Sequence, residues 1–309
     1  MTSFTDRLAL AVRTKKTPTL VGLDPRWESL PAVLTPPGGL DSLSARAAAY
    51  ELFCRGVVDV VAPLVPAVKP QAAFFEELGP EGMAALGRII DYCHEKQLLV
   101  ILDAKRNDIG STAAAYARGI LGPKPQSAWG ADALTVSPYL GEDSLRPFVE
   151  AAVERSAGLF VLVKTSNPGG GMFQDLIAED RPLYRHVAAF VRRLAEETQG
   201  DCGYGSVGAV VGATYPEQLA QLRQDLPRAW LLVPGFGSQG GTAADVAAAF
   251  DQQGLGAVIN NSRGIIFAHQ RREYAERYGA SRWQEAVEAA TRQMIQQLRT
   301  ETPAGRLTA

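Results

Sequence analysis

The sequence predicts an α/β protein with one domain, a closed (β/α)8 barrel of the TIM type that spans residues 1–309. Short apolar segments alternate with helical segments along the chain, which is typical of a parallel sheet. Eight such repeats, with charged residues at the ends of most strands, favour a closed barrel over an open sheet. The length and the 46% hydrophobic content allow a buried core of that size.

Eight apolar segments rich in β-forming residues are expected to be the strands. They comprise residues 19–23, 65–69, 98–105, 133–136, 159–164, 207–211, 230–234 and 257–261. The third, LLVILDAK, begins as a continuous apolar run, as in a strand buried on both faces, and then becomes charged. A buried strand that ends in charged residues predicts a functional site.

Segments with the helical spacing of apolar residues follow the strands. They comprise residues 44–61, 79–96, 111–121, 143–156, 182–198, 216–225 and 242–252. The connection 165–205 is too long for a simple loop after the fifth strand, and it contains the glycine-rich turn SNPGGG. We interpret it as a functional insertion after strand five, and we expect residues 300–309 to form a frayed tail.

Composition and charge argue against several classes of function. The formal net charge is −2 without blocks of one sign, so nothing indicates a nucleic acid or an anionic membrane as partner. No apolar run is long enough to span a membrane, the start lacks a secretory pattern, and the three cysteines form no C-x-x-C pair. We therefore expect a soluble cytoplasmic protein with a small-molecule partner.

The charged strand ends are expected to meet, because the carboxyl ends of barrel strands surround the active site. They are Asp24, Lys69, Asp103, Lys105, Lys164 and Arg263. Asp103 and Lys105 point the same way along one strand, with Asp108 in the turn beyond. A neighbouring aspartate and lysine stabilise each other's charged forms and can act on a substrate together, although an ordinary salt bridge explains a bare D-x-K pattern equally well.

Two loops have the features of a phosphate site. PGFGSQGG follows the seventh strand and NSRG follows the eighth, the places where barrels often bind phosphate. Glycines let the backbone approach an anion, Gln239 offers an amide donor, and Arg263 offers a fork of N–H donors. Glycines that merely turn the chain are the alternative. The arginine at the next strand end favours the phosphate site.

Three motifs resemble those of the orotidine 5'-phosphate decarboxylase family. DAKRNDIGST, which starts at Asp103, is similar to the family signature D-x-K-x-x-D-I-x-x-T. The pattern P-G-x-G-x-Q-G-G with a following Ser-Arg pair resembles the family's phosphate site, and TSNP at 165–168 resembles a bacterial subgroup with a longer fifth loop. The resemblance implies the barrel fold and the decarboxylation of orotidine 5'-monophosphate to uridine 5'-monophosphate, the last step of its de novo synthesis, without metal or cofactor.

The resemblance also implies catalytic roles for four charged residues, which are Lys69, Asp103, Lys105 and Asp108. Lys105 would protonate C6 of the pyrimidine as CO2 departs. Asp103 would lie against the substrate carboxylate, so that their repulsion is relieved when CO2 leaves. Lys69 and Asp108 would complete an alternating array of charges and position Lys105.

Substrate contacts are implied for Asp24, Ile109, Thr112, Ser166, Pro234, Gly235, Gln239, Ser262 and Arg263. In the family pattern, Asp24 would bind ribose hydroxyls and Ser166 would bind the pyrimidine. Gln239 and Arg263 would hold the phosphate, with the neighbouring loop residues shaping the pocket. The segment that contains Asp108, Ile109 and Thr112 would reach into a partner's site, so the resemblance implies a homodimer with shared active sites.

Two other functions remain compatible with the residues. A lysine-dependent aldolase on the same barrel would use Lys105 or Lys164 as a Schiff-base amine. A non-catalytic nucleotide-binding protein would keep the phosphate loops and use the charges structurally. Against the second, the charged cluster at residues 103–108 is more elaborate than binding requires. The histidines have no spacing that suits a metal site.

Overall fold

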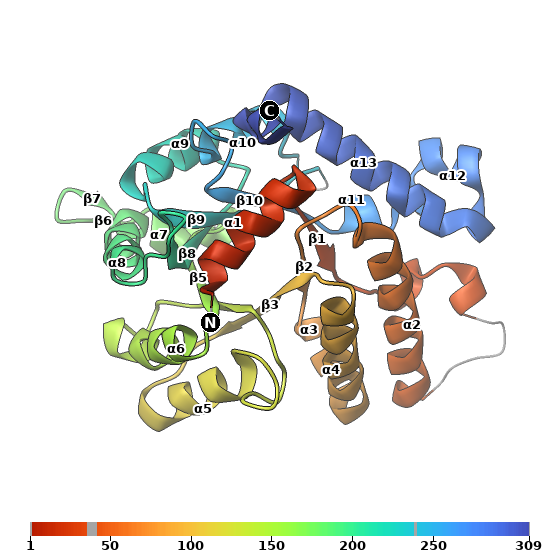
Figure 1. The fold of residues 1–309 in the computed structure, drawn as a ribbon, viewed down its shortest axis with the longest axis horizontal. Coiled ribbons are helices and arrows are strands. Elements are labelled where there is room, and N and C mark those ends of the chain that lie inside the picture. The colour runs from red at the N-terminus through yellow and green to blue at the C-terminus, as the bar shows by residue number, and fades with distance from the viewer. Residues whose placement is uncertain (1, 36–41, 238–239, 309) are drawn as a thin grey trace.

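The strands of the chain close into a parallel barrel, as predicted (Figure 1). The computed structural model describes residues 2–35, 42–237 and 240–308. The barrel strands are β1 Thr19–Leu23, β2 Ala67–Pro70, β3 Leu99–Arg106, β4 Ala133–Val136, β5 Gly158–Lys164, β8 Gly205–Val211, β9 Ala229–Val233 and β10 Ala257–Asn261. Their order around the barrel is β1, β10, β9, β8, β5, β4, β3 and β2, and each neighbouring pair is parallel. The predicted strands agree with these to within two residues at each end.

Helices surround the barrel and alternate with its strands (Figure 1). They are α1 Phe4–Lys15, α2 Leu43–Val61, α3 Ala73–Glu76, α4 Gly79–Glu95, α5 Gly110–Ile120, α6 Glu142–Glu154, α7 Gly171–Gln174, α8 Leu183–Glu197, α9 Pro216–Asp225, α10 Ala243–Val246, α11 Arg263–Ile266, α12 Arg272–Tyr278 and α13 Trp283–Glu301. The 3-10 helices are η1 Trp27–Ser29, η2 Ala32–Leu34, η3 Pro168–Gly170, η4 Ala247–Ala249, η5 Ala268–Gln270, η6 Ala280–Arg282 and η7 Pro303–Thr308. Within the described ranges, none of the helices has the length and hydrophobicity needed to cross a bilayer.

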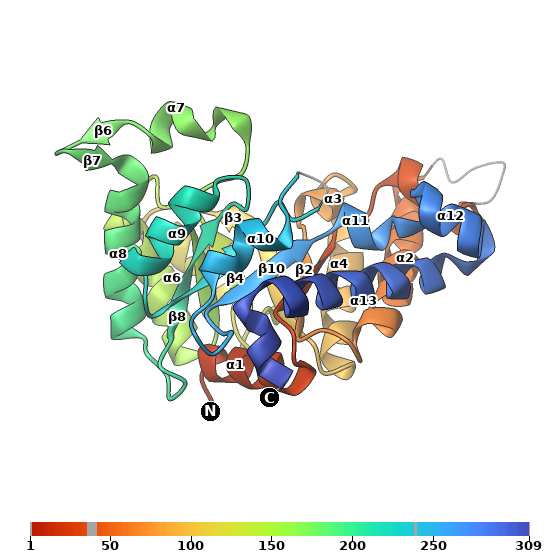
Figure 2. The same ribbon diagram turned by 90° about the horizontal axis from the view of Figure 1, so that it is seen from above.

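Helix α1 covers the end of the barrel opposite α7 (Figure 2). Phe4 is buried at this end, and its ring packs edge to face on Phe160 with the centroids 6.2 Å apart. Next to it, the Thr5 hydroxyl accepts a hydrogen bond from Trp230 Nε1 at 2.9 Å. Phe4, Phe160 and Trp230 belong to one apolar cluster. Helix α1 and these apolar side chains close one end of the barrel, so the polar side chains gather at the other end, where the strands have their carboxyl ends.

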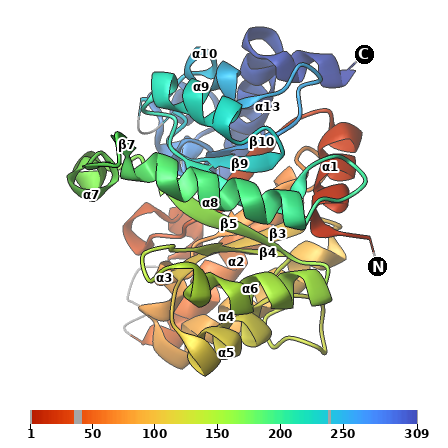
Figure 3. The same ribbon diagram turned by 90° about the vertical axis from the view of Figure 1, so that its left-hand side faces the viewer.

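The insertion after the fifth barrel strand has a small structure of its own. It contains η3, α7 and an antiparallel hairpin of β6 Ile177–Ala178 and β7 Arg181–Pro182, which leads into α8. Figure 3 shows α7 and the hairpin projecting beyond the barrel, away from the end that carries α1. The predicted insertion and its helix are confirmed, whereas the hairpin was not predicted.

Two expectations about the last quarter of the chain are wrong. Residues 242–252 form α10 and η4 instead of one helix. The Asp251 side chain accepts hydrogen bonds from the N–H groups of Gln253 and Leu255, and this local turn competes with the helix. Instead of a frayed tail, the described residues from 300 onwards complete α13 and form η7, where Ala304 is buried.

Candidate active site

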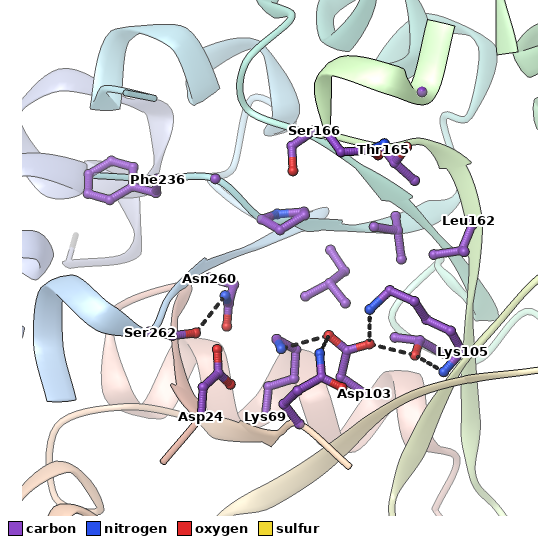
Figure 4. Close-up of a pocket in the computed structure, with 18 of the residues that line it drawn as sticks. Asp24, Lys69, Asp103, Lys105, Leu162, Thr165, Ser166, Phe236, Asn260 and Ser262 are labelled. Carbon is purple, nitrogen blue, oxygen red and sulfur yellow. Dashed lines mark hydrogen bonds and ion pairs between the residues drawn. The ribbon is translucent and has the colours of Figure 1, made fainter. Parts of the chain in front are cut away.

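Most of the predicted strand-end charges meet in one cavity of about 610 Å³ at the carboxyl ends of the strands (Figure 4). The charged residues that line it are Asp24, Lys69, Asp103, Lys105 and Arg263. They come from β1, β2, β3 and the start of α11, so the topology of the barrel brings together residues that are far apart in the sequence. The predicted convergence is confirmed for these five residues.

Asp103 is the centre of the charge cluster in this cavity. Lys69 Nζ donates to its Oδ2 at 2.8 Å, and Lys105 Nζ donates to its Oδ1 at 2.6 Å. Gln71 Nε2 and the Thr135 hydroxyl donate to the same carboxylate at 3.2 and 2.9 Å. A buried carboxylate therefore accepts hydrogen bonds from four side chains, two of which carry positive charge.

The two buried members of this cluster have shifted pKa values. Burial alone would raise the pKa of the Asp103 carboxyl, but the ammonium groups of Lys69 and Lys105 hold it well below its usual range. Burial would likewise lower the pKa of Lys69, but the charges of Asp103 and Asp24 raise it above its usual value. At neutral pH the cavity thus presents a carboxylate between two ammonium groups.

The backbone at Lys105 is bent, and the bend brings its side chain back to Asp103. Lys105 has a φ of 46°, in the left-handed region that residues other than glycine rarely adopt, and the register of β3 against β4 shifts at this point. Thr135 on β4 supports the bend, because its hydroxyl accepts hydrogen bonds from the N–H groups of Ala104 and Lys105 at 3.1 and 2.9 Å. The Lys105 side chain is still 46% exposed.

The predicted phosphate loops reach the same cavity. Its lining includes Pro234, Gly235, Ser262 and Arg263. Gly235 has a φ of 101°, so the loop needs a glycine there. The Arg263 guanidinium has no hydrogen-bond or ion-pair partner among the described residues, which leaves its charge available to an anion. Gln239, the other predicted phosphate ligand, lies outside the described residues.

Ser166 lines the cavity at the start of the insertion, as predicted. A polar network beside it ties the insertion together, because Gln174 Nε2 donates to the Thr165 hydroxyl at 2.8 Å and Gln174 Oε1 accepts from the Thr165 N–H at 3.0 Å. The Thr165 hydroxyl in turn donates to Asn167 Oδ1 at 2.7 Å. Phe173 also reaches the cavity, so the insertion forms one of its walls.

Lys164 does not line the cavity, so the predicted convergence is wrong for this strand end. Leu162 lines the cavity instead, and the register of β5 against β8 shifts between the two residues. The Lys164 side chain is 1% exposed, forms an ion pair with Asp175 and lies 4.8 Å from the centre of the Tyr215 ring. Lys164 therefore holds the insertion on the barrel.

Asp108, Ile109 and Thr112 also lie outside the cavity of their own chain. Asp108 Oδ1 accepts a hydrogen bond from the Ile109 N–H at 2.8 Å, and Ile109 is 58% exposed. Thr112 borders a separate groove on α5, together with Tyr116. The structure of one chain therefore does not bring these three residues to Asp103 and Lys105.

The sequence reasoning assigned no role to six polar residues of the cavity, which are Gln71, Thr135, Thr165, Asn167, Gln174 and Asn260. A signal existed for Thr135 and Asn260, because each is a polar residue inside a strand that is otherwise apolar or buried. Gln71 directly follows the charged end of β2. Among the residues described, no group of three or more histidine, cysteine, aspartate or glutamate side chains could hold a metal ion.

The fold and the cavity define a class: a (β/α)8 barrel with an array of lysine and aspartate side chains at the carboxyl ends of its strands. The family model of the orotidine 5'-phosphate decarboxylase / HUMPS family matches residues 21–278. The chain belongs to this family.

Individual relatives agree with this assignment. The chain is 55% identical over 306 residues to an orotidine 5'-phosphate decarboxylase of Rhodopirellula baltica. The alignment covers 97% of this chain and 100% of the relative. An orotidine 5'-phosphate decarboxylase of Caldicellulosiruptor bescii is 39% identical over 281 residues, with 87% and 91% covered. The solved structure of Leishmania donovani OMP decarboxylase is 34% identical, has a TM-score of 0.74, and covers 99% of each chain.

Substitution of Asp103 tests its charge state. Asp103→Asn leaves two ammonium groups around a neutral amide, and we expect the free energy of unfolding to fall by about 3 kcal/mol at pH 7. The lowered pKa of Asp103 stabilises the folded state above the ordinary aspartate pKa of 3.8, and this contribution is lost as the pH falls through the folded-state value. Urea unfolding of wild type and Asp103→Asn at several pH values will measure this contribution to the free energy of unfolding.

The difference between wild type and Asp103→Asn is therefore expected to shrink as the pH falls below about 4. Asp91→Asn is the matched control, because Asp91 pairs with Lys124 at the exposed surface and its loss is expected to change little at any pH. A difference that stays constant down to pH 3 would contradict the lowered pKa of Asp103.

Proposed function

We propose that this chain is a carboxy-lyase that converts orotidine 5'-monophosphate to uridine 5'-monophosphate and CO2, the step that completes de novo synthesis of this nucleotide. The observation that carries the proposal is the Lys69–Asp103–Lys105 array, which lies in the same cavity as Arg263 and the loop at Gly235. Membership of the family and the 55% identity to a named decarboxylase support it.

The array suits a reaction that develops negative charge on carbon. When the bond between C6 and the carboxylate breaks, its electron pair stays on C6, and the nearby Lys105 ammonium group stabilises this charge and transfers a proton to it. Asp103 lies against the substrate carboxylate, and their repulsion ends as CO2 leaves. Lys69 keeps Asp103 ionised, because its ammonium group lowers the pKa of that carboxyl.

The remaining contacts hold the rest of the nucleotide. Arg263 and the loop at Pro234 and Gly235 bind the phosphate, and Ser166 binds the pyrimidine, while Asp24 accepts from the ribose. Phosphate contacts far from C6 also contribute to the rate when their binding energy is used to close loops over the site. The unpaired charge of Arg263 within the described chain supports its role as an anion ligand.

A homodimer with shared active sites is part of the proposal. The positions of Asp108, Ile109 and Thr112 support it, because all three lie outside the cavity of their own chain and Ile109 is largely exposed. The proposal also keeps the predicted cytoplasmic location, which the three free cysteines support because reducing compartments maintain thiols. The aldolase alternative would depend on Lys105 alone, since Lys164 is buried outside the cavity.

The proposed reaction is tested with orotidine 5'-monophosphate and purified full-length chain in EDTA. We expect the ultraviolet absorbance of the orotate ring to be lost with wild type, and Lys105→Ala to slow this loss by at least about 10²-fold, because a proton donor typically contributes that much. Lys124→Ala is the control, since this lysine pairs with Asp91 away from the cavity. Folded wild type without turnover would refute the proposed function.

Thr135→Val tests whether the bend at Lys105 serves catalysis. The substitution keeps the shape but removes both the acceptor for two N–H groups and one of the donors to Asp103. Lys105 Nζ is therefore expected to shift and kcat to fall by about 10- to 100-fold, while KM changes less than threefold. Thr291→Val is the matched control, because this buried hydroxyl bonds only within α13. Equal effects of both substitutions on kcat would show that the loss is not specific to Lys105.

Mixing two inactive variants tests the shared sites. Lys105→Ala and Asp108→Ala are each expected to be inactive alone, whereas joint refolding produces heterodimers with one site that holds both native residues. Activity is therefore expected to return, up to about a quarter of the wild-type value for random pairing at equal amounts. No recovery with heterodimers confirmed by native mass spectrometry would mean that one chain builds each site.

A further inference from the structure

Asn260 contributes a buried polar side chain to the cavity. It is the fourth residue of β10, is 7% exposed, and lies beside Ser262 and above Asp24 in Figure 4. Its Nδ2 donates to the Ser262 hydroxyl oxygen at 3.3 Å, but its Oδ1 is buried and has no hydrogen-bond partner among the described residues. A buried acceptor that lines a cavity suits a ligand group that donates a hydrogen bond to it.

A second acceptor in the same state stands on the neighbouring strand. Asp24 Oδ1, at the end of β1, is also buried without a partner within the described chain, and Asp24 and Asn260 line the same cavity. The strands β1 and β10 are paired directly. Two acceptors on adjacent strands match a ligand that offers two neighbouring donors. A phosphate offers none when ionised, whereas the two hydroxyls of a ribose ring offer both.

The fold leaves space for this arrangement at Gly22. A Cβ atom at this position would lie 1.8 Å from the Ser262 hydroxyl oxygen and 3.3 Å from Asn260 Oδ1, so any larger residue at position 22 would displace the Ser262 side chain and crowd that of Asn260. Because Ser262 accepts from Asn260, its own hydrogen remains available to a ligand next to Arg263. Asn260 therefore connects the sugar side of the cavity to its phosphate side.

We infer that Asn260 is a further substrate-binding residue, whose Oδ1 accepts a hydrogen bond from one ribose hydroxyl while Asp24 accepts from the other. The inference rests on the proposed function and assigns part of its selectivity for ribonucleotides to this residue. Asn261 provides a contrast, since its Oδ1 is equally buried without a described partner but the residue does not line the cavity.

Calorimetric titration of the full chain with uridine, 2'-deoxyuridine and 3'-deoxyuridine 5'-monophosphates tests the inference. Wild type is expected to bind the ribonucleotide about 2- to 10-fold more tightly than each deoxy analogue, as one hydrogen bond typically provides. Asn260→Ala is expected to lower the affinity for the ribonucleotide by this factor. Its affinity for one of the two deoxy analogues is expected to stay within twofold of the wild-type value. The preference for one hydroxyl then disappears.

Two further variants keep the test decisive. Asn260→Leu retains the side-chain volume and is expected to lose the same hydroxyl preference, and Asn261→Ala is expected to retain the wild-type ratio between the three nucleotides. Circular dichroism confirms folding. Equal weakening of all three nucleotides by both Asn260 variants, or a wild type without hydroxyl preference, would overturn the inference alone. A wild type that neither binds uridine 5'-monophosphate nor decarboxylates its precursor would overturn the proposed function itself.

Discussion

One buried carboxylate, that of Asp103, imposes the constraint on which the site depends. An ionised carboxylate removed from water must be paired, and lysines on two different strands satisfy Asp103 here. Lys105 belongs to the same strand as Asp103, and its side chain returns to Asp103 because the backbone at Lys105 is left-handed. Thr135 holds this backbone in place. Local strain of this kind persists only where the surroundings fix it. The charge of Asp103 thus holds the ammonium groups of Lys69 and Lys105 at one point of the cavity.

The apolar half of the barrel makes this constraint effective. Phe4 on α1 packs on Phe160, so apolar side chains fill the end of the barrel opposite the charges. In such a low-dielectric environment each ion pair and hydrogen bond is stronger than in water, and an unpaired polar atom is more costly. A helix that precedes the first strand and belongs to none of the βα repeats therefore contributes to the site that lies at the other end of the barrel.

The sequence predicted what depends on local pattern and missed what depends on contacts across the barrel. Apolar runs gave the strands to within two residues, and their charged ends gave Lys69, Asp103 and Lys105. Thr135 could not be assigned a role, because its hydroxyl accepts a hydrogen bond from the Lys105 N–H on the neighbouring strand. This contact depends on a shift in the register between β3 and β4, and such a shift leaves no pattern in the sequence. The same kind of irregularity in β5 turned Lys164 away from the cavity, and no periodicity marks Asp175 as its partner.

The two sides of the cavity are held by different means. Asp24 directly follows β1, and Asn260 lies on β10, which pairs with β1, so the geometry of the sheet fixes the side proposed to bind the sugar. Ser166 sits on the insertion, which the ion pair between Lys164 and Asp175 ties to the barrel, and Lys164 itself does not line the cavity. If the insertion moved away, Lys164 would lose Asp175 and remain as a buried charge without a partner, which is strongly unfavourable. The ion pair therefore restrains, from outside the cavity, the wall that carries Ser166, which is the side proposed to bind the pyrimidine.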